Sequence, residues 1–123
     1  MKKISIIFIT TIALLSIAAV ASAGYKLSVP VSVTTTSFTG AMGSARMSSD
    51  NLQYLFCRDN GNSAFCGARN SAGTTKSCTT TNVNHLNVIR SMVDTSRIGV
   101  NFSSGTCTSI YQVNGSYYDT LVQ

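Results

Sequence analysis

Apolar and polar residues alternate strictly over residues 25–33, and this alternation predicts a β-strand with one buried face. Pro30 lies within the strand and has no N–H to offer a neighbouring strand, so we expect this strand at an edge of the sheet. Residues 34–49 are rich in Thr, Ser, Gly and Ala, which predicts a loop that crosses to the main body of the domain.

Three further strands are predicted at residues 52–58, 64–69 and 74–80. The connection at residues 59–62 contains Asn and Gly and that at residues 71–73 ends in Gly, residue types that tolerate the positive φ angles of tight turns. Strands joined by such short turns run antiparallel, so this region is predicted to be a three-strand meander.

A helix of about three turns is predicted after the meander, because Val83, Leu86, Ile89 and Val93 recur at helical spacing. A polar residue at positions 80–82 (Thr80, Thr81 or Asn82) can cap its first turn.

A final hairpin is predicted from residues 98–102 and 106–113, joined by a three-residue loop. That loop length places Ile98 opposite Ile110 and Asn101 opposite Cys107, and the helix is expected to pack on the apolar face that results. The whole pattern predicts an α+β domain with a mainly antiparallel sheet: an N-terminal strand, a three-strand meander, one helix and a C-terminal hairpin.

Residues 1–23 have the pattern of a secretory signal peptide: Lys2 and Lys3, an apolar run, and a cleavage site at Ala21-Ser22-Ala23. The short basic start is typical of bacteria, so we expect a secreted or periplasmic protein. Residues 24–123 then form a single domain with no membrane span after cleavage. Without the leader, seven scattered basic residues stand against four aspartates, a pattern that does not favour nucleic-acid binding.

Four cysteines in an oxidising compartment predict disulfides that stabilise this small domain. A turn centred between Gly61 and Asn62 places Cys57 opposite Cys66, while one centred on Ala72 places Cys66 opposite Cys78 equally well. We favour Cys57 with Cys66 and Cys78 with Cys107, because these pairs tie the meander to the final hairpin and leave no free thiol.

The sequence predicts no catalytic, metal or cofactor site. The cysteines are separated by 8, 11 and 28 residues, unlike the close pairs of zinc or redox motifs, and His85 is the only histidine. Asp59 is explained by a turn and Asp94 by the end of the helix, so neither is assigned to catalysis. His85 is expected to be partly buried beside the apolar face of the helix.

Two groups of residues are candidates for a recognition surface. Arg46, Asp50, Gln53 and Tyr54 lie within nine residues of a sparsely charged chain. The alternative is a local network in which Arg46 pairs with Asp50 and Tyr54 enters the core. The second group is Tyr111, Tyr117 and Tyr118, which form either an exposed aromatic surface or rings packed on the sheet.

The pattern G-S-A-R-x-S-x-D-x-x-Q-Y-x-x-C at residues 43–57 resembles small exported bacterial proteins without an assigned activity. The likeness continues through residues 68–73 to Cys78 and Cys107. It implies a secreted, cysteine-containing domain and carries over no catalytic residue.

The leading interpretation is an exported, non-enzymatic domain that binds a protein or a cell-envelope component through one sheet face or edge. One alternative is a small secreted hydrolase or an enzyme inhibitor that presents residues 59–63 or 103–105 to its target. Another is a self-assembling surface subunit in which residues 25–33 add as a strand to a neighbouring copy. The sequence specifies no oligomeric state.

Overall fold

The computed structural model describes residues 25–118, so the predicted leader at residues 1–23 lies outside the described residues. The elements are β1 (Ser32–Val33), β2 (Ser37–Ala41), α1 (Met42–Arg46), β3 (Tyr54–Asp59), β4 (Ala64–Arg69), β5 (Thr75–Thr80), α2 (Val83–Arg90), β6 (Ser96–Ser103) and β7 (Thr106–Asn114). They form one seven-stranded sheet in the order β1-β2-β6-β7-β5-β4-β3. The fold is broadly α+β, as predicted, but the sheet is mixed, because β5 and β7 pair in parallel while the other neighbours are antiparallel.

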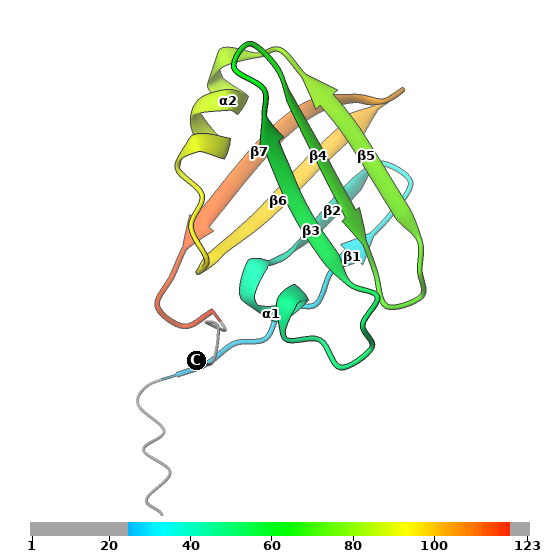
Figure 1. Ribbon diagram of the computed structural model, residues 1–123, viewed down its shortest axis with the longest axis vertical. Helices are drawn as coiled ribbons and strands as arrows, with labels where there is room; N and C mark the ends of the chain where they lie inside the picture. Colours follow the sequence, from blue (N-terminus) through cyan, green and yellow to red (C-terminus); the bar gives the residue numbers. More distant parts are fainter. Residues whose placement is uncertain (1–24, 119–123) are drawn as a thin grey trace, which may run out of the picture.

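The sheet curls over on itself, so that β3, β4 and β5 lie in front of β1, β2 and β6, with α1 near one end and α2 near the other (Figure 1). Gly40 of β2 allows this approach, because an added Cβ would lie 3.2 Å from Val31 Cα and 3.3 Å from Leu55 Cδ2. Apolar side chains fill the space between the two halves; the largest contributions come from Val31, Phe38, Leu55, Leu86, Ile89, Ile98, Val100 and Ile110.

The loop predicted at residues 34–49 is wrong, because β2 and α1 both lie within it. Phe38 of β2 is fully buried and lies opposite Val100 of β6. Gly40 and Ala41 are of residue types depleted in strands, so β2 depends on pairing with β6, which no local pattern reveals. The sequence predicted a single helix, after the meander, so α1 is a second helix that it did not predict.

The N-terminal segment lies at the sheet edge, where Pro30 led us to expect it, but only its last two residues form a strand, β1. Before β1, isolated backbone bonds and side chains together hold the segment: the Leu27 N–H donates to the Tyr117 carbonyl over 2.6 Å, and the Ala41 N–H donates to the Val29 carbonyl over 3.0 Å. The Val29 N–H donates to Ser44 Oγ over 2.9 Å, and the Val31 N–H donates to Gln53 Oε1 over 2.9 Å. The segment is thereby fixed to the domain without a regular neighbouring strand.

The meander is confirmed, with β4 paired antiparallel to both β3 and β5. Cys66 lies opposite Cys57 on one side and Cys78 on the other, as the turn centres predicted. Gly61 has φ of 96° and Gly73 has φ of 84°, a conformation that a side chain would strain. These two glycines therefore fix the register of three strands.

Helix α2 is confirmed but has only eight residues, about two turns. The Asn82 side chain caps it by accepting from the Asn84 N–H over 2.8 Å. Leu86 and Ile89 are buried, whereas Val93 lies beyond the end of the helix and is 52% exposed. Val83, at the start of the helix, is 61% exposed, so the helical pattern identified only the middle of the buried face and overestimated the length.

The final hairpin forms, but its predicted register is wrong. Its turn consists of two residues, Ser104 and Gly105, both with positive φ, instead of three. A bulge between Asn101 and Phe102 precedes the turn. There the Phe102 N–H donates to the Thr36 carbonyl over 2.9 Å. The observed pairs are Ile98 with Gln112, Val100 with Ile110 and Asn101 with Ser109.

Two disulfides join Cys57 to Cys66 and Cys78 to Cys107, the pairs that the sequence favoured, and no cysteine within residues 25–118 is free. The first bridge links directly opposite residues of β3 and β4. The second links β5 to the beginning of β7, beside the single parallel residue pair between these strands. The second disulfide therefore joins the meander to the rest of the sheet.

We expect the two disulfides to stabilise the fold unequally. The loop-entropy relation gives about 3.6 kcal/mol for the bridge of 29-residue separation and about 2.6 kcal/mol for that of 9-residue separation. Urea unfolding of the double variants Cys78→Ala/Cys107→Ala and Cys57→Ala/Cys66→Ala measures both. Equal losses, or a larger loss for the second variant, would contradict this assignment.

Candidate functional site

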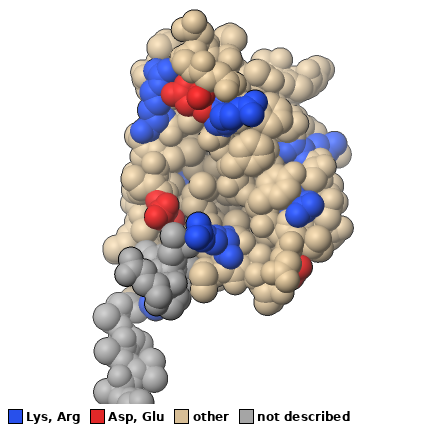
Figure 2. Space-filling model, in the orientation of Figure 1, with Lys and Arg blue, Asp and Glu red and all other residues tan. Residues whose placement is uncertain are grey.

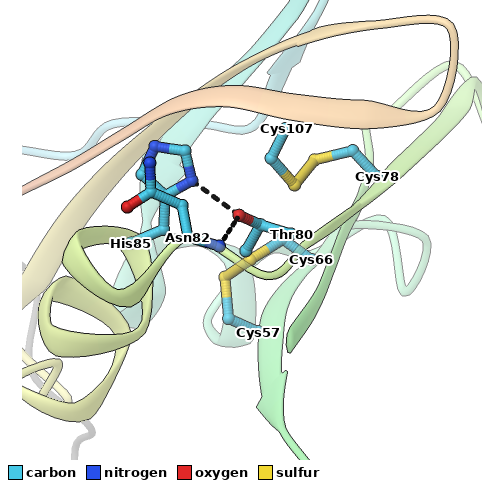
Figure 3. The surroundings of a disulfide bond; sticks show 7 residues. All are labelled: Cys57, Cys66, Cys78, Thr80, Asn82, His85 and Cys107. Carbon is cyan, nitrogen blue, oxygen red and sulfur yellow. Dashed lines mark hydrogen bonds between the residues drawn. A yellow bond between two sulfur atoms is a disulfide. The ribbon is translucent and has the colours of Figure 1, made fainter. Parts of the chain in front are cut away.

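His85 lies on α2 beside the two disulfides, half-buried as predicted, and its ring faces a threonine (Figure 3). Its Nδ1 is 2.7 Å from the Oγ1 of Thr80, which is buried and also accepts from the Asn82 N–H over 3.2 Å. The ring's partner is therefore a hydroxyl that organises the start of α2, and not a carboxylate that would orient a catalytic base.

Asp50 and Gln53 form a local network that holds the N-terminal segment. Asp50 Oδ2 accepts from Gln53 Nε2 over 2.6 Å, and Asp50 Oδ1 accepts from the backbone N–H of Leu52 and of Gln53. These bonds, first of all that from the Gln53 side chain, hold the pKa of Asp50 below its ordinary value. Because Gln53 also accepts from Val31, both residues are explained by structure.

Arg46 and Tyr54 are outside this network. The only ion pair among residues 25–118 joins Arg90 to Asp59, so the predicted pairing of Arg46 with Asp50 is wrong. The prediction that Tyr54 enters the core is also wrong, because Tyr54 is 37% exposed.

Arg46 instead lines a cleft of about 230 Å³. The other lining residues include Met42, Ala45, Leu55 and Asp94, so the lining combines apolar side chains with a basic and an acidic one. The face of the molecule drawn in Figure 2 is hollowed near its centre, and acidic and basic side chains lie at the rim of the hollow.

The three candidate tyrosines have separate environments. Tyr111 is 44% exposed, and its ring covers Gly99 on β6, where an added Cβ would lie 2.2 Å from a ring carbon. Tyr118 is buried, and its ring centre lies 4.6 Å from that of Tyr117. The hydrogen bond between the two hydroxyl groups stabilises protonated Tyr117 and raises its pKa. Packing on the sheet therefore describes Tyr111 and Tyr118 better than a shared exposed surface.

An exposed aromatic surface does occur, on β3 and β4. It consists of Tyr54 and Phe56, both exposed, and the half-buried Phe65. The ring centre of Phe56 lies 5.9 Å from that of Tyr54 and 5.7 Å from that of Phe65. Arg69 lies 4.8 Å from the Tyr54 ring centre and Arg58 lies 5.9 Å from that of Phe65. We call these five residues the aromatic face. Its arrangement of rings and guanidinium groups is typical of interface centres.

A groove of about 550 Å³ continues from the aromatic face across β5 to the turn between β6 and β7. Ligand sites in proteins commonly have volumes of about 300–1,000 Å³. Its lining comes from the aromatic rings of β3 and β4, from β5 and from the turn after β6: Tyr54, Phe56, Phe65, Gly67, Thr75, Lys76, Ser77, Ser104 and Gly105, with Thr35 and Phe102. Ser77 is opposite Gly67 and shares its face of the sheet, whereas Lys76 is opposite Ala68 and belongs to the other face.

Sequence reasoning missed the aromatic face, although the predicted register contained the signal. If Cys57 lies opposite Cys66, then Phe56 lies opposite Gly67 and Arg58 opposite Phe65, as observed. Residues at even steps from Phe56 on β3 share one face of the sheet. The apolar residues of β3 are thus divided between the two faces of the sheet: Leu55 lies on the inner face, and the aromatic rings of Tyr54 and Phe56 lie on the outer face.

Asp59 and Arg90 connect the first turn of the meander to α2. Arg90 Nε donates to Asp59 Oδ2 over 2.6 Å, and Arg90 Nη2 donates to the Gly61 carbonyl over 2.7 Å. Asp59 also accepts from the Gly61 N–H, which confirms its predicted role in the turn. The hydrogen bond from Arg90, followed by that from Gly61, lowers the pKa of Asp59.

Comparison with known proteins finds no match to this chain among protein families, curated proteins or solved structures. Within residues 25–118, no helix is long and apolar enough to cross a membrane. In the same part of the chain, no cluster of three or more His, Cys, Asp or Glu side chains is placed to hold a metal ion. The site must therefore be judged from its own geometry.

Gln53→Glu should lower the melting temperature by several degrees at neutral pH. The new carboxylate would face Asp50 at a position where the amide now donates a hydrogen bond over 2.6 Å. Acidification that protonates one of the two carboxyl groups should recover part of the loss. Asn87→Asp, an exposed change on α2, is the control in thermal unfolding from neutral to acidic pH. Equal effects of both variants would contradict the network.

Stability should be constant above about pH 5 and should fall below about pH 4, because an unfolded aspartate has a pKa of about 3.9. The folded pKa values of Asp50 and Asp59 are lowered, so their contribution is present above the unfolded pKa and is lost as pH falls through the folded values. Asp59→Asn should show a smaller loss on acidification. Melting temperatures across this pH range decide the point, and identical acid sensitivity of variant and parent would refute it.

Proposed function

We propose that this chain is an exported, non-enzymatic domain that binds a protein or a cell-envelope component through the aromatic face. The observation that carries the proposal is the exposure of Tyr54 and Phe56, each 37% exposed, beside a groove that could accept part of a partner. Large rings cost less conformational entropy to immobilise than long flexible chains, so they suit binding surfaces.

The aromatic face has features that packing alone does not explain. On the inner face of β4, Ala64, Cys66 and Ala68 are fully buried and small, whereas Phe65 lies on the outer face. Phe56 covers Gly67, where an added Cβ would lie 2.9 Å from a ring carbon. Burying these rings against a partner would remove apolar area from water, which is the main favourable term in association.

Export is part of the proposal and has its own support. Two disulfides fit an oxidising compartment such as the bacterial periplasm or the cell exterior, and the pattern of residues 1–23 is that of a signal peptide. Self-assembly through residues 25–33 has less support, because backbone groups of Val29 and Val31 already have partners within the domain. No feature of residues 25–118 gives comparable support to the inhibitor or hydrolase alternatives.

Phe56→Ala should reduce binding of the proposed partner about ten-fold, a change of about 1.4 kcal/mol. The disulfide-bonded domain is immobilised, exposed to a native envelope extract, and the bound species are quantified by mass spectrometry. Tyr111→Ala is the matched control, because Tyr111 covers Gly99 as Phe56 covers Gly67 but lies on β7. We expect this variant to keep the bound species.

Two results would reject the proposal. One is equal loss of binding in the Phe56 and Tyr111 variants when both remain folded by thermal unfolding. The other is a bound fraction that does not depend on Phe56 at all. In either case the exposed rings would have a purely structural role.

A further inference from the structure

The first half of β5 has an unpaired backbone edge. On the side away from β4, β5 pairs with β7 at only one position, Thr79 opposite Thr106, where the Thr79 N–H donates to the Gly105 carbonyl over 2.9 Å. Before Thr79 the strand continues through residues 75–77, all exposed. Within the described part of the chain, no hydrogen bond reaches this edge from another strand or from a side chain.

Strand geometry identifies the free groups. Successive residues of a strand direct their N–H and C=O groups to opposite sides, and those of Thr79 face β7. The N–H and C=O groups of Ser77 and Thr75 must therefore face the same way, into the groove that both residues line. The groove thus contains donors and acceptors at the spacing of a β-ladder.

The side chains beside this edge favour an acidic ligand. Lys76 lines the groove and is exposed, and Arg58 and Arg69 belong to the adjoining aromatic face. Among residues 25–118, none that lines the groove is acidic. Charge complementarity therefore points to a negatively charged partner.

We infer that the groove binds an extended, acidic segment of a partner protein, which adds as a short strand to the edge of β5 at residues 75–77. The inference rests on the proposed function and specifies its partner. Alternate side chains of the added strand would lie next to Ser77 and Gly67, which are small and leave room toward the Phe56 ring. Main-chain bonds would supply affinity, and the rings and basic groups would select the side chains.

A polypeptide fits this edge better than a nucleic acid. The edge alternates donors and acceptors, as a peptide backbone does, whereas phosphate oxygens only accept hydrogen bonds. Proteins that bind single-stranded nucleic acid contact many phosphates with basic residues. The groove and the aromatic face provide three basic residues for this purpose, Lys76, Arg58 and Arg69. Binding of an oligonucleotide is therefore an outcome that the test must be able to reveal.

The test selects binders from a phage-displayed library of random peptides of about ten residues, the scale of a β-strand ligand. The immobilised target is the full exported chain with its disulfides intact. We expect enriched peptides to carry Asp or Glu and to bind at least five-fold more weakly to Lys76→Gln. Methylation of alternate backbone nitrogens in a selected peptide should weaken binding about ten-fold, because it removes the ladder donors.

A matched pair of variants tests the edge from the side of the domain. Ser77→Pro removes the N–H that faces the groove, whereas Ser77→Ala keeps it, so the proline variant should bind about ten-fold more weakly than the alanine variant. If Ser77→Pro does not fold, the methylated peptides decide. The inference fails if no peptides are enriched or if the enriched peptides are basic. It also fails if methylation of the peptide backbone has no effect on binding, or if a mixed-sequence oligonucleotide binds as tightly as the selected peptides. Capture that depends on Phe56 would still support the proposed function in those cases.

Discussion

The junction between β5 and β7 is the constraint on which the rest of the structure depends. On one side of it lies the meander, and on the other lie β1, β2, β6 and β7. The two parts of the sheet share one parallel residue pair, and the Cys78–Cys107 disulfide lies directly beside it. A ladder this short contributes little alone, so the covalent bond and the packing across the core hold the junction. Because the junction ends at Thr79, it also leaves the beginning of β5 without a neighbouring strand on the side away from β4.

The distribution of large and small side chains follows from this curled sheet. The inner face of β4 lies so close to the opposite half that small buried residues suffice there, and Phe38, Ile98 and Val100 supply the volume from the other side. The rings of Tyr54, Phe56 and Phe65 are then on the outer face, where the core gains little from them. A fold that places its largest meander side chains outward retains apolar area for an interaction with something else.

The sequence predicted the parts of the fold that local chemistry determines. Positive φ angles at Gly61 and Gly73 fix the meander, and the alternation of residues 25–33 reflects the burial of Val31 at a sheet edge. The sequence did not reveal β2, because its short stretch ends in Gly40 and Ala41, residue types depleted in strands, and depends on pairing with β6. The hairpin register failed for a related reason: Ser104 adopts a positive φ, and the Phe102 N–H bonds to a distant carbonyl.

The candidate site was predicted less well, since residues adjacent in sequence are not always neighbours on a surface. Asp50 and Gln53 hold the N-terminal segment, whereas the aromatic face combines alternate positions of two strands.

The other open edges of the sheet are protected, which gives the gap beside β5 more weight. Exposed strand edges invite unwanted pairing, and proteins usually shorten or cover them. Here β1 has two residues and follows Pro30, while α1 and α2 both pack against β3 at the opposite edge. Residues 75–77 have neither protection, although a residue or two more of pairing between β5 and β7 would have closed the gap. The chain instead turns back at Ser104 and Gly105 and leaves a strand edge open beside exposed rings and basic groups, which is the arrangement that a site for strand addition requires.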